Sequence, residues 1–173
     1  MFTTRRLVLI AVFIALATTI SIIERAIIIP GLHPAVKPGF ANIVTLLSIM
    51  LLGYKDAFLV VAIRCVLGAL IGGTPVSFLF SITGGLLSTV VMSVMWHYLK
   101  KQVSIINISI IGAICHNIGQ LFVAAVMGGG FQIYILLPVL MVSAIITGYI
   151  VGLLSKYVYK QLLDRGMGDY RLS

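Results

Sequence analysis

The feature that most constrains this chain is a series of apolar runs, most of them close to 20 residues long, that recur over its whole length. About 20 helical residues are needed to cross the hydrocarbon core of a bilayer. Of the 173 residues, 61% are hydrophobic and only 9% are charged, whereas roughly 25% of the residues in a soluble domain are charged. The sequence therefore excludes a soluble globular protein and a disordered chain, and it predicts an all-α membrane protein.

Glycine, proline and charged residues divide the apolar sequence into six segments. Three prolines and two glycines within residues 30–39 exclude a helix there, which separates the first segment from the second. We expect a single integral membrane domain over residues 1–173 with six transmembrane helices. The predicted spans lie at about 7–29, 40–52, 57–71, 76–99, 103–127 and 131–158.

The basic residues predict how these spans are oriented. The chain has 12 Lys and Arg against 4 Asp and Glu, a net charge of +8. These bases flank the apolar runs instead of forming a basic face, so we expect no nucleic-acid partner. With the N-terminus inside, only Lys37 falls in an outer loop, and Arg25 and Arg64 fall within spans. The cytoplasmic set is then Arg5, Arg6, Lys55, Lys100, Lys101, Lys156, Lys160, Arg165 and Arg171. This asymmetry predicts a multi-pass protein of the cell (plasma) membrane with both termini in the cytoplasm.

Ionisable residues within the predicted spans are candidates for a functional site, because each costs about 3 kcal/mol to insert at the centre of a bilayer. His116 and Gln120 are one helical turn apart and share a face, with Asn117 at its edge. Arg64 and Glu24 lie at similar depths. We expect these side chains to converge on a substrate-binding pocket in the outer half of the membrane, formed by Glu24, Lys37, Asn42, Arg64, His116, Asn117 and Gln120.

Two alternatives remain open for this group. The amides and His116 are equally suited to hydrogen bonds that hold helices together. Arg64 and Glu24 either form a structural ion pair, or Arg64 contacts an anionic ligand while Glu24 orients it. We expect no catalytic residue, metal site or cofactor, because the four acids Glu24, Asp56, Asp164 and Asp169 form no clustered motif that would hold Mg²⁺ and a diphosphate.

Two stretches carry a resemblance to a known family. The segments 37–46 (KPGFANIVTL) and 112–120 (GAICHNIGQ), with an alanine pair at Ala11 and Ala15, resemble the substrate-binding S components of energy-coupling factor (ECF) transporters. They are most similar to the Gx transporter family, also called heptaprenyl diphosphate synthase component I. The resemblance covers residues 7–155 and departs at Pro38, where a small aliphatic residue is expected.

The resemblance implies a bundle of six helices that binds substrate and associates with an ECF T component and two cytosolic ATPases. It places Ala11 and Ala15 at the contact with the T component, where small side chains permit close approach. The chain has no GxxxxGK[ST] motif, so ATP hydrolysis must come from partners. The excess of cations favours an anionic or carbonyl-rich amphipathic substrate. The alternative is a non-catalytic membrane subunit in isoprenoid, quinone or flavin-linked redox metabolism.

The base distribution gives a test of topology. Single cysteines introduced at Thr4 and Leu172 should react with a membrane-impermeant thiol reagent only after the cells are opened, because both positions are expected in the cytoplasm. The native Cys65 and Cys115 should first be replaced by Ala. Labelling of either introduced cysteine in intact cells would contradict the predicted orientation.

Overall fold

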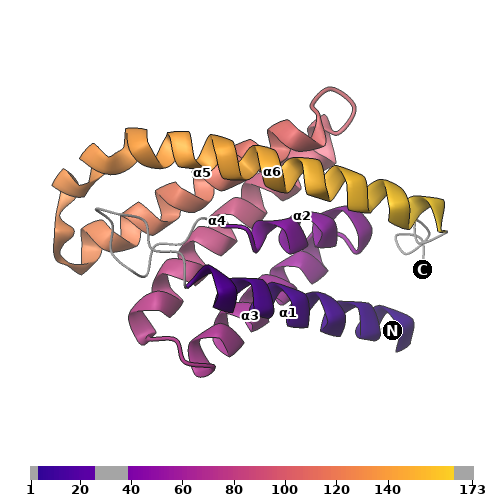
Figure 1. Ribbon diagram of the computed structural model, residues 1–173, viewed down its shortest axis with the longest axis horizontal. Coiled ribbons are helices and arrows are strands. Elements are labelled where there is room, and N and C mark those ends of the chain that lie inside the picture. Colours follow the sequence, from indigo (N-terminus) through magenta and orange to yellow (C-terminus); the bar gives the residue numbers. More distant parts are fainter. Residues whose placement is uncertain (1–3, 26–38, 166–173) are drawn as a thin grey trace.

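The computed structural model describes residues 4–25 and 39–165, and all the regular secondary structure in these ranges is helical. Figure 1 shows the bundle. Its α-helices are α1 (Thr4–Glu24), α2 (Asn42–Leu51), α3 (Tyr54–Leu70), α4 (Pro75–Leu99), α5 (Ile105–Ala124) and α6 (Leu137–Asp164). A π-helical turn, η1 (Ala125–Gly129), and a 3₁₀ segment, η2 (Phe131–Leu136), join α5 to α6. The predicted all-α class is confirmed.

Four of the helical stretches are long and apolar enough to cross a membrane, which supports a multi-pass membrane protein. They are Thr4–Glu24, Pro75–Leu99, Ile105–Gly128 and Gln132–Asp164. The other two helices are shorter, with 10 residues in α2 and 17 in α3. All residues of α2 except Ile43 are buried, so this helix packs inside the bundle. Six crossings therefore remain a prediction.

Local sequence explains where the helices begin and end. Thr74 caps α4 through a reciprocal pair of side-chain bonds with Ser77, and Pro75 occupies the first turn, where its missing N–H has no cost. Gly53 has φ +98°, which allows the tight turn between α2 and α3. Some expected boundaries shift: α6 continues to Asp164, because the residues after 158 still support helix and pack against the core.

Side-chain contacts fix the direction of α1 relative to α3. Arg6 forms an ion pair with Asp56, with 2.8 Å between Nε and Oδ2, near the start of both helices. Arg25 donates to the carbonyl oxygens of Gly68 and Ile71 at the end of α3, the latter at 2.9 Å. The two helices are therefore parallel, and Arg25 satisfies carbonyl groups that the end of a helix leaves without partners.

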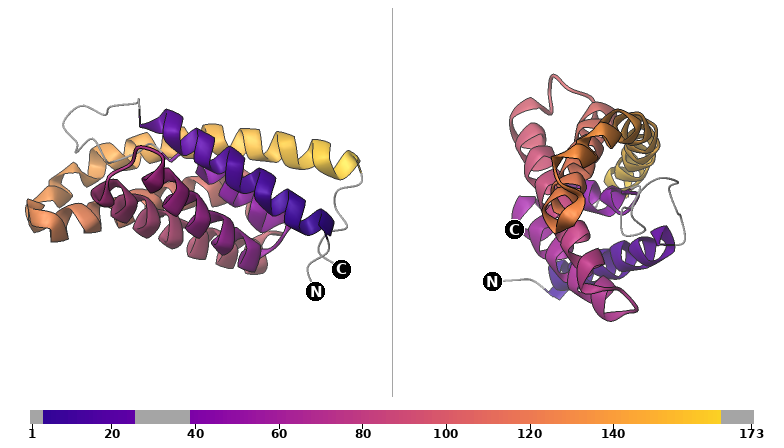
Figure 2. Two further views of the ribbon diagram at one scale, coloured as in Figure 1. Left: turned by 90° about the horizontal axis from the view of Figure 1, so that it is seen from below. Right: turned by 90° about the vertical axis from the view of Figure 1, so that its left-hand side faces the viewer.

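The basic residues gather at one end of the bundle, which we call the basic end. There α1 and α3 begin and α4 and α6 end, and Figures 1 and 2 show the start of α1 and the end of α6 on this side. The described bases at this end are Arg5, Arg6, Lys55, Lys100, Lys101, Lys156, Lys160 and Arg165. Segregation of charge to one end is what the predicted orientation requires, although which side of the membrane it faces stays a prediction.

Small residues let the longest helices approach closely. A Cβ added at Gly148 of α6 would lie 2.6 Å from the Cα of Ile110 in α5, and one added at Gly152 would lie 2.7 Å from the Cα of Ile106. Similarly, a Cβ at Gly119 of α5 would lie 2.9 Å from the Cα of Gly84 in α4. The glycines at spacing four therefore serve packing between helices, as expected of such stripes in membranes.

Gly148 offers a direct test of this packing. Gly148→Ala should lower the free energy of unfolding by about 1–3 kcal/mol, because the methyl group would collide with backbone that can only yield by moving α5 away from α6. Thermal denaturation in detergent would measure the loss. The matched control is Val142→Ile, which adds one methylene on the exposed face of the same helix and should leave stability unchanged. Equal stability of the two variants would contradict the close approach.

Candidate functional site: a buried polar cluster

Polar side chains from five helices meet inside the bundle, between its middle and the end opposite the basic end. Each is at most 3% exposed. We call this group the polar cluster; its members are Ser21 and Glu24 of α1, Asn42 of α2, Arg64 of α3, Ser88 of α4, and His116 and Gln120 of α5. Burial of so many polar groups in a membrane protein is costly unless they bond to one another or to a ligand.

Arg64 is the cation of the cluster, and its hydrogen bonding is incomplete. Its Nη1 donates to the hydroxyl of Ser21 at 2.9 Å. Its Nε and Nη2 are buried and have no hydrogen-bond partner among the described residues. Within the same part of the chain Arg64 makes no ion pair, so the structural pair with Glu24, one of the two alternatives for these residues, is not formed there. The guanidinium therefore retains donors and a charge that the described residues do not balance.

Glu24 instead serves the start of α2. Its carboxylate accepts a hydrogen bond from the backbone N–H of Ala41 at 3.3 Å. Ala41 provides no side-chain cap of its own. A carboxylate beside a helix N-terminus satisfies exposed N–H groups and interacts favourably with the helix dipole. Glu24 thus anchors the end of α1 to the beginning of the buried α2.

Asn42 of α2 and His116 of α5 both lie close to Gly39. The Ser88 hydroxyl donates to Asn42 Oδ1 at 3.5 Å, while Asn42 Nδ2 is buried without a described partner. A Cβ added at Gly39 would lie 3.3 Å from Asn42 Nδ2 and 3.4 Å from Cδ2 of His116. Gly39 has φ +89°, which favours glycine. The Asn42 amide is enclosed beside the middle of α4.

His116 and Gln120 form a pair along α5. The distance between His116 Nε2 and Gln120 Nε2 is 2.8 Å, so the ring nitrogen accepts from the amide. The imidazole packs against Gly84, where an added Cβ would lie 3.0 Å from both Nδ1 and Cε1. Glycine at this place in α4 therefore makes room for the ring, and the predicted stacking of residues 116 and 120 on one face is observed.

The remaining predicted site residues lie elsewhere. Asn117 points away from the cluster and donates to the carbonyl oxygen of Leu140 in α6 at 2.9 Å, a bond that holds two helices together. Lys37 lies outside the described residues. Ala11 and Ala15 are exposed on α1, opposite its buried face, where a partner could reach them. Placement alone does not test their roles, and those roles stay predictions.

A small cavity adjoins Arg64. It lies between α1, α3 and α4, is bordered by Ser21, Cys65 and Ser81 among others, and has a volume of about 10 Å³. That volume suits about one water molecule. A larger ligand would therefore require the surrounding helices to separate, and α1 is the helix whose removal would open this space.

Sequence reasoning missed three contributions. Ser21, the hydrogen-bond partner of Arg64, lies one turn before Glu24, and that spacing was the available signal. Arg25, which falls within a predicted span, caps α3 through the carbonyl oxygens of Gly68 and Ile71. Asp56 lies in the first turn of α3, and its carboxylate accepts a hydrogen bond from Arg6. Among the described residues no three His, Cys, Asp or Glu side chains gather as a metal site.

Comparison with known proteins gives one family. The model of the family described as heptaprenyl diphosphate synthase component I matches residues 13–158, most of the chain and all members of the polar cluster. No curated protein and no solved structure matches the chain.

Proposed function

This chain belongs to the heptaprenyl diphosphate synthase component I family, and from that membership and its buried polar cluster we propose that it is the substrate-binding membrane subunit of an ECF-type importer. The substrate is a small amphipathic molecule with an anionic or carbonyl-rich group. The proposal includes an ECF T component and two cytosolic ATPases as partners. It also includes six membrane crossings, a plasma-membrane location and cytoplasmic termini.

The observation that carries this proposal is the environment of Arg64. Removing a guanidinium from water costs several kcal/mol even after the protein relaxes around it, unless a counter-charge and hydrogen-bond acceptors replace the water. Here two buried nitrogens have no described acceptor and Glu24 is engaged at α2. An anionic or carbonyl oxygen of a ligand would satisfy both nitrogens. A structural arginine would be expected to resemble Arg25, whose terminal nitrogens are bonded to backbone carbonyls.

A second candidate function rests on the family description, which implies a system with more than one component. In that case the chain would be an accessory membrane subunit for prenyl diphosphate synthesis or for quinone or flavin-linked redox metabolism. The acids do not favour catalysis by the chain itself: Glu24 contacts α2, Asp56 contacts Arg6, and Asp164 ends α6. Stable co-purification with a prenyl synthase instead of a T component would favour this second function.

Arg64 provides the test of substrate binding. Protein purified gently from its native membrane should retain a small anionic or carbonyl-containing molecule, detectable by native mass spectrometry. Arg64→Gln should weaken its binding by about 2 kcal/mol, the usual contribution of a hydrogen bond to a charged group. The ligand-free protein should keep its thermal stability, because the substitution also removes an uncompensated charge.

Arg25→Gln is the matched control for this experiment. It removes the same charge within the same half of the bundle, but it breaks contacts to Gly68 and Ile71 and should reduce stability while ligand is retained. Undiminished ligand binding by Arg64→Gln would exclude Arg64 from the site. A loss of stability as large as that of Arg25→Gln would assign Arg64 a structural role.

The exposed alanines test the association with partners. Ala11→Trp should abolish co-purification with a T component but leave ligand binding intact, because an indole would fill the surface that close helix contact requires. Leu16→Trp is the control: Leu16 is 50% exposed on the same helix, about 100° around the axis from Ala15. If both variants assemble normally, the docking role of Ala11 and Ala15 is wrong.

A further inference from the structure

The basic end carries a second feature, an apolar groove between α3 and α4 that is separate from the polar cluster. The groove has a volume of about 350 Å³. Tyr54 and Phe58 of α3 form one side, and Val90 and Val94 of α4 form the other. Val90 and Val94 are 45% and 51% exposed, so the groove is open along its length to the surroundings of the bundle. In a bilayer that surrounding phase is lipid.

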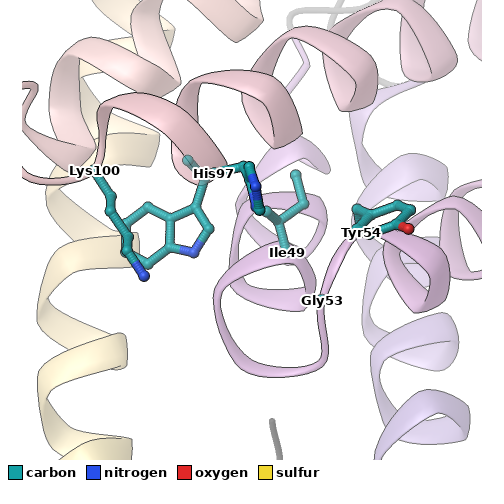
Figure 3. A pocket seen from close by; sticks show the side chains of 6 residues that line it. Ile49, Gly53, Tyr54, His97 and Lys100 are labelled. Carbon is teal, nitrogen blue, oxygen red and sulfur yellow. The ribbon is translucent and has the colours of Figure 1, made fainter.

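An adjoining cavity connects this groove to the end of α4. Its volume is about 200 Å³, and Tyr54 and His97 border both spaces. Figure 3 shows the side chains of Lys100 and His97 at the end of α4, with His97 lying between Lys100 and Tyr54, and all three border this cavity. Among the described residues the side chains of Lys100 and His97 make no hydrogen bond or ion pair, and the His97 ring has an edge contact with Tyr98. The groove thus ends in positive and polar groups that are available to a ligand.

Polarity changes along the groove in the same direction as it does in a lipid molecule. Val90 and Lys100 are ten residues apart on α4, which corresponds to about 15 Å along the helix. Between them, the hydroxyl of Ser93 is buried in the groove wall without a described hydrogen-bond partner. Val90 therefore comes first, then the Ser93 hydroxyl with Val94 next to it, then His97 and Lys100. An acyl chain, an ester oxygen and a phosphate follow one another in this order.

We propose that this groove is a binding site for an anionic glycerophospholipid. One acyl chain lies along Phe58, Val90 and Val94, the Ser93 hydroxyl donates to an ester oxygen, and the phosphate contacts Lys100 and His97. The site shares no lining residue with the cavity beside Arg64, and the proposal is independent of the proposed import function.

Two considerations identify the occupant as a membrane phospholipid. The groove opens sideways, so a lipid can enter without leaving its leaflet, with its headgroup already level with Lys100. The second consideration is charge. Five lysines lie at this end, namely Lys55, Lys100, Lys101, Lys156 and Lys160, and a basic group at a membrane surface attracts anionic headgroups by about 1 kcal/mol. Free phosphate would satisfy the cations but would leave the apolar groove unfilled.

Native mass spectrometry of the full-length chain in detergent would test this site. Phosphatidylglycerol should give a one-lipid complex, and phosphatidylcholine with the same acyl chains should give much less. Lys100→Ala should reduce the phosphatidylglycerol complex about fivefold, the effect expected for one cation at a headgroup. Lys160→Ala is the matched control, because it removes the same charge at the same end but Lys160 borders neither cavity, and it should bind lipid like wild type.

A second variant tests the apolar part. Val94→Trp should fill the groove and reduce lipid binding while every cation remains. Equal binding of the two lipids, or equal losses from Lys100→Ala and Lys160→Ala, would overturn the proposal. Unchanged binding by Val94→Trp would do the same. Competition at millimolar inorganic phosphate would reassign the site to a free anion, and displacement by equimolar farnesyl diphosphate would reassign it to a prenyl diphosphate.

Discussion

The cost of burying the Arg64 charge is the constraint around which the interior of this bundle is organised. A guanidinium in a low-dielectric interior needs several acceptors and a counter-charge, and the described residues provide one hydroxyl, that of Ser21. Glu24, the acidic member of the polar cluster, accepts from the start of α2. Arg6, by contrast, is paired with Asp56. Arg25 donates from both terminal nitrogens to carbonyl groups and leaves its Nε without a described partner, whereas Arg64 leaves two nitrogens in that state.

The buried helix α2 explains how a polar cluster can exist at this depth. Because α2 has only 10 residues, it begins within the bundle instead of at its surface, and its first turn brings Asn42 beside Ser88 in the middle of α4. The first N–H groups of a helix that begins in the interior need hydrogen-bond acceptors, and the Glu24 carboxylate accepts from the N–H of Ala41. The glycines at positions 84 and 85 then bring α4 close enough for its backbone to contact His116 and Arg64. Each of these features depends on the others.

Most of the fold could be predicted from the sequence, because apolar length, helix breakers and base distribution act locally. Thr74 and Pro75 are signals for a helix start, and the glycines at 128–130 are signals for a helix end, whatever the surrounding fold.

The site was harder to predict, because composition does not say which of several possible partners a buried polar group bonds to. Asn117 and Gln120 looked equivalent, but a turn of 100° per residue directs Asn117 to the Leu140 carbonyl and Gln120 to His116. Glu24 and Arg64 matched in depth, yet the start of α2 competed for the carboxylate. Such competition depends on tertiary contacts.

Helix α1 connects the two surfaces that the proposed function requires. One face contributes Ser21 and Glu24 to the polar cluster and Arg25 to the end of α3, while the opposite face exposes Ala11 and Ala15. Helix α1 packs on the core through Ile10, Phe13 and Ala17, and it has polar contacts nearer its ends, Arg6 with Asp56 and Ser21 with Arg64. A partner that binds the exposed face acts on the same rigid element that closes the cavity beside Arg64. Any displacement of α1 would open that space and remove the Ser21 acceptor together. In the proposed importer, therefore, contact with the partner and release of an anionic ligand are mechanically linked through this helix.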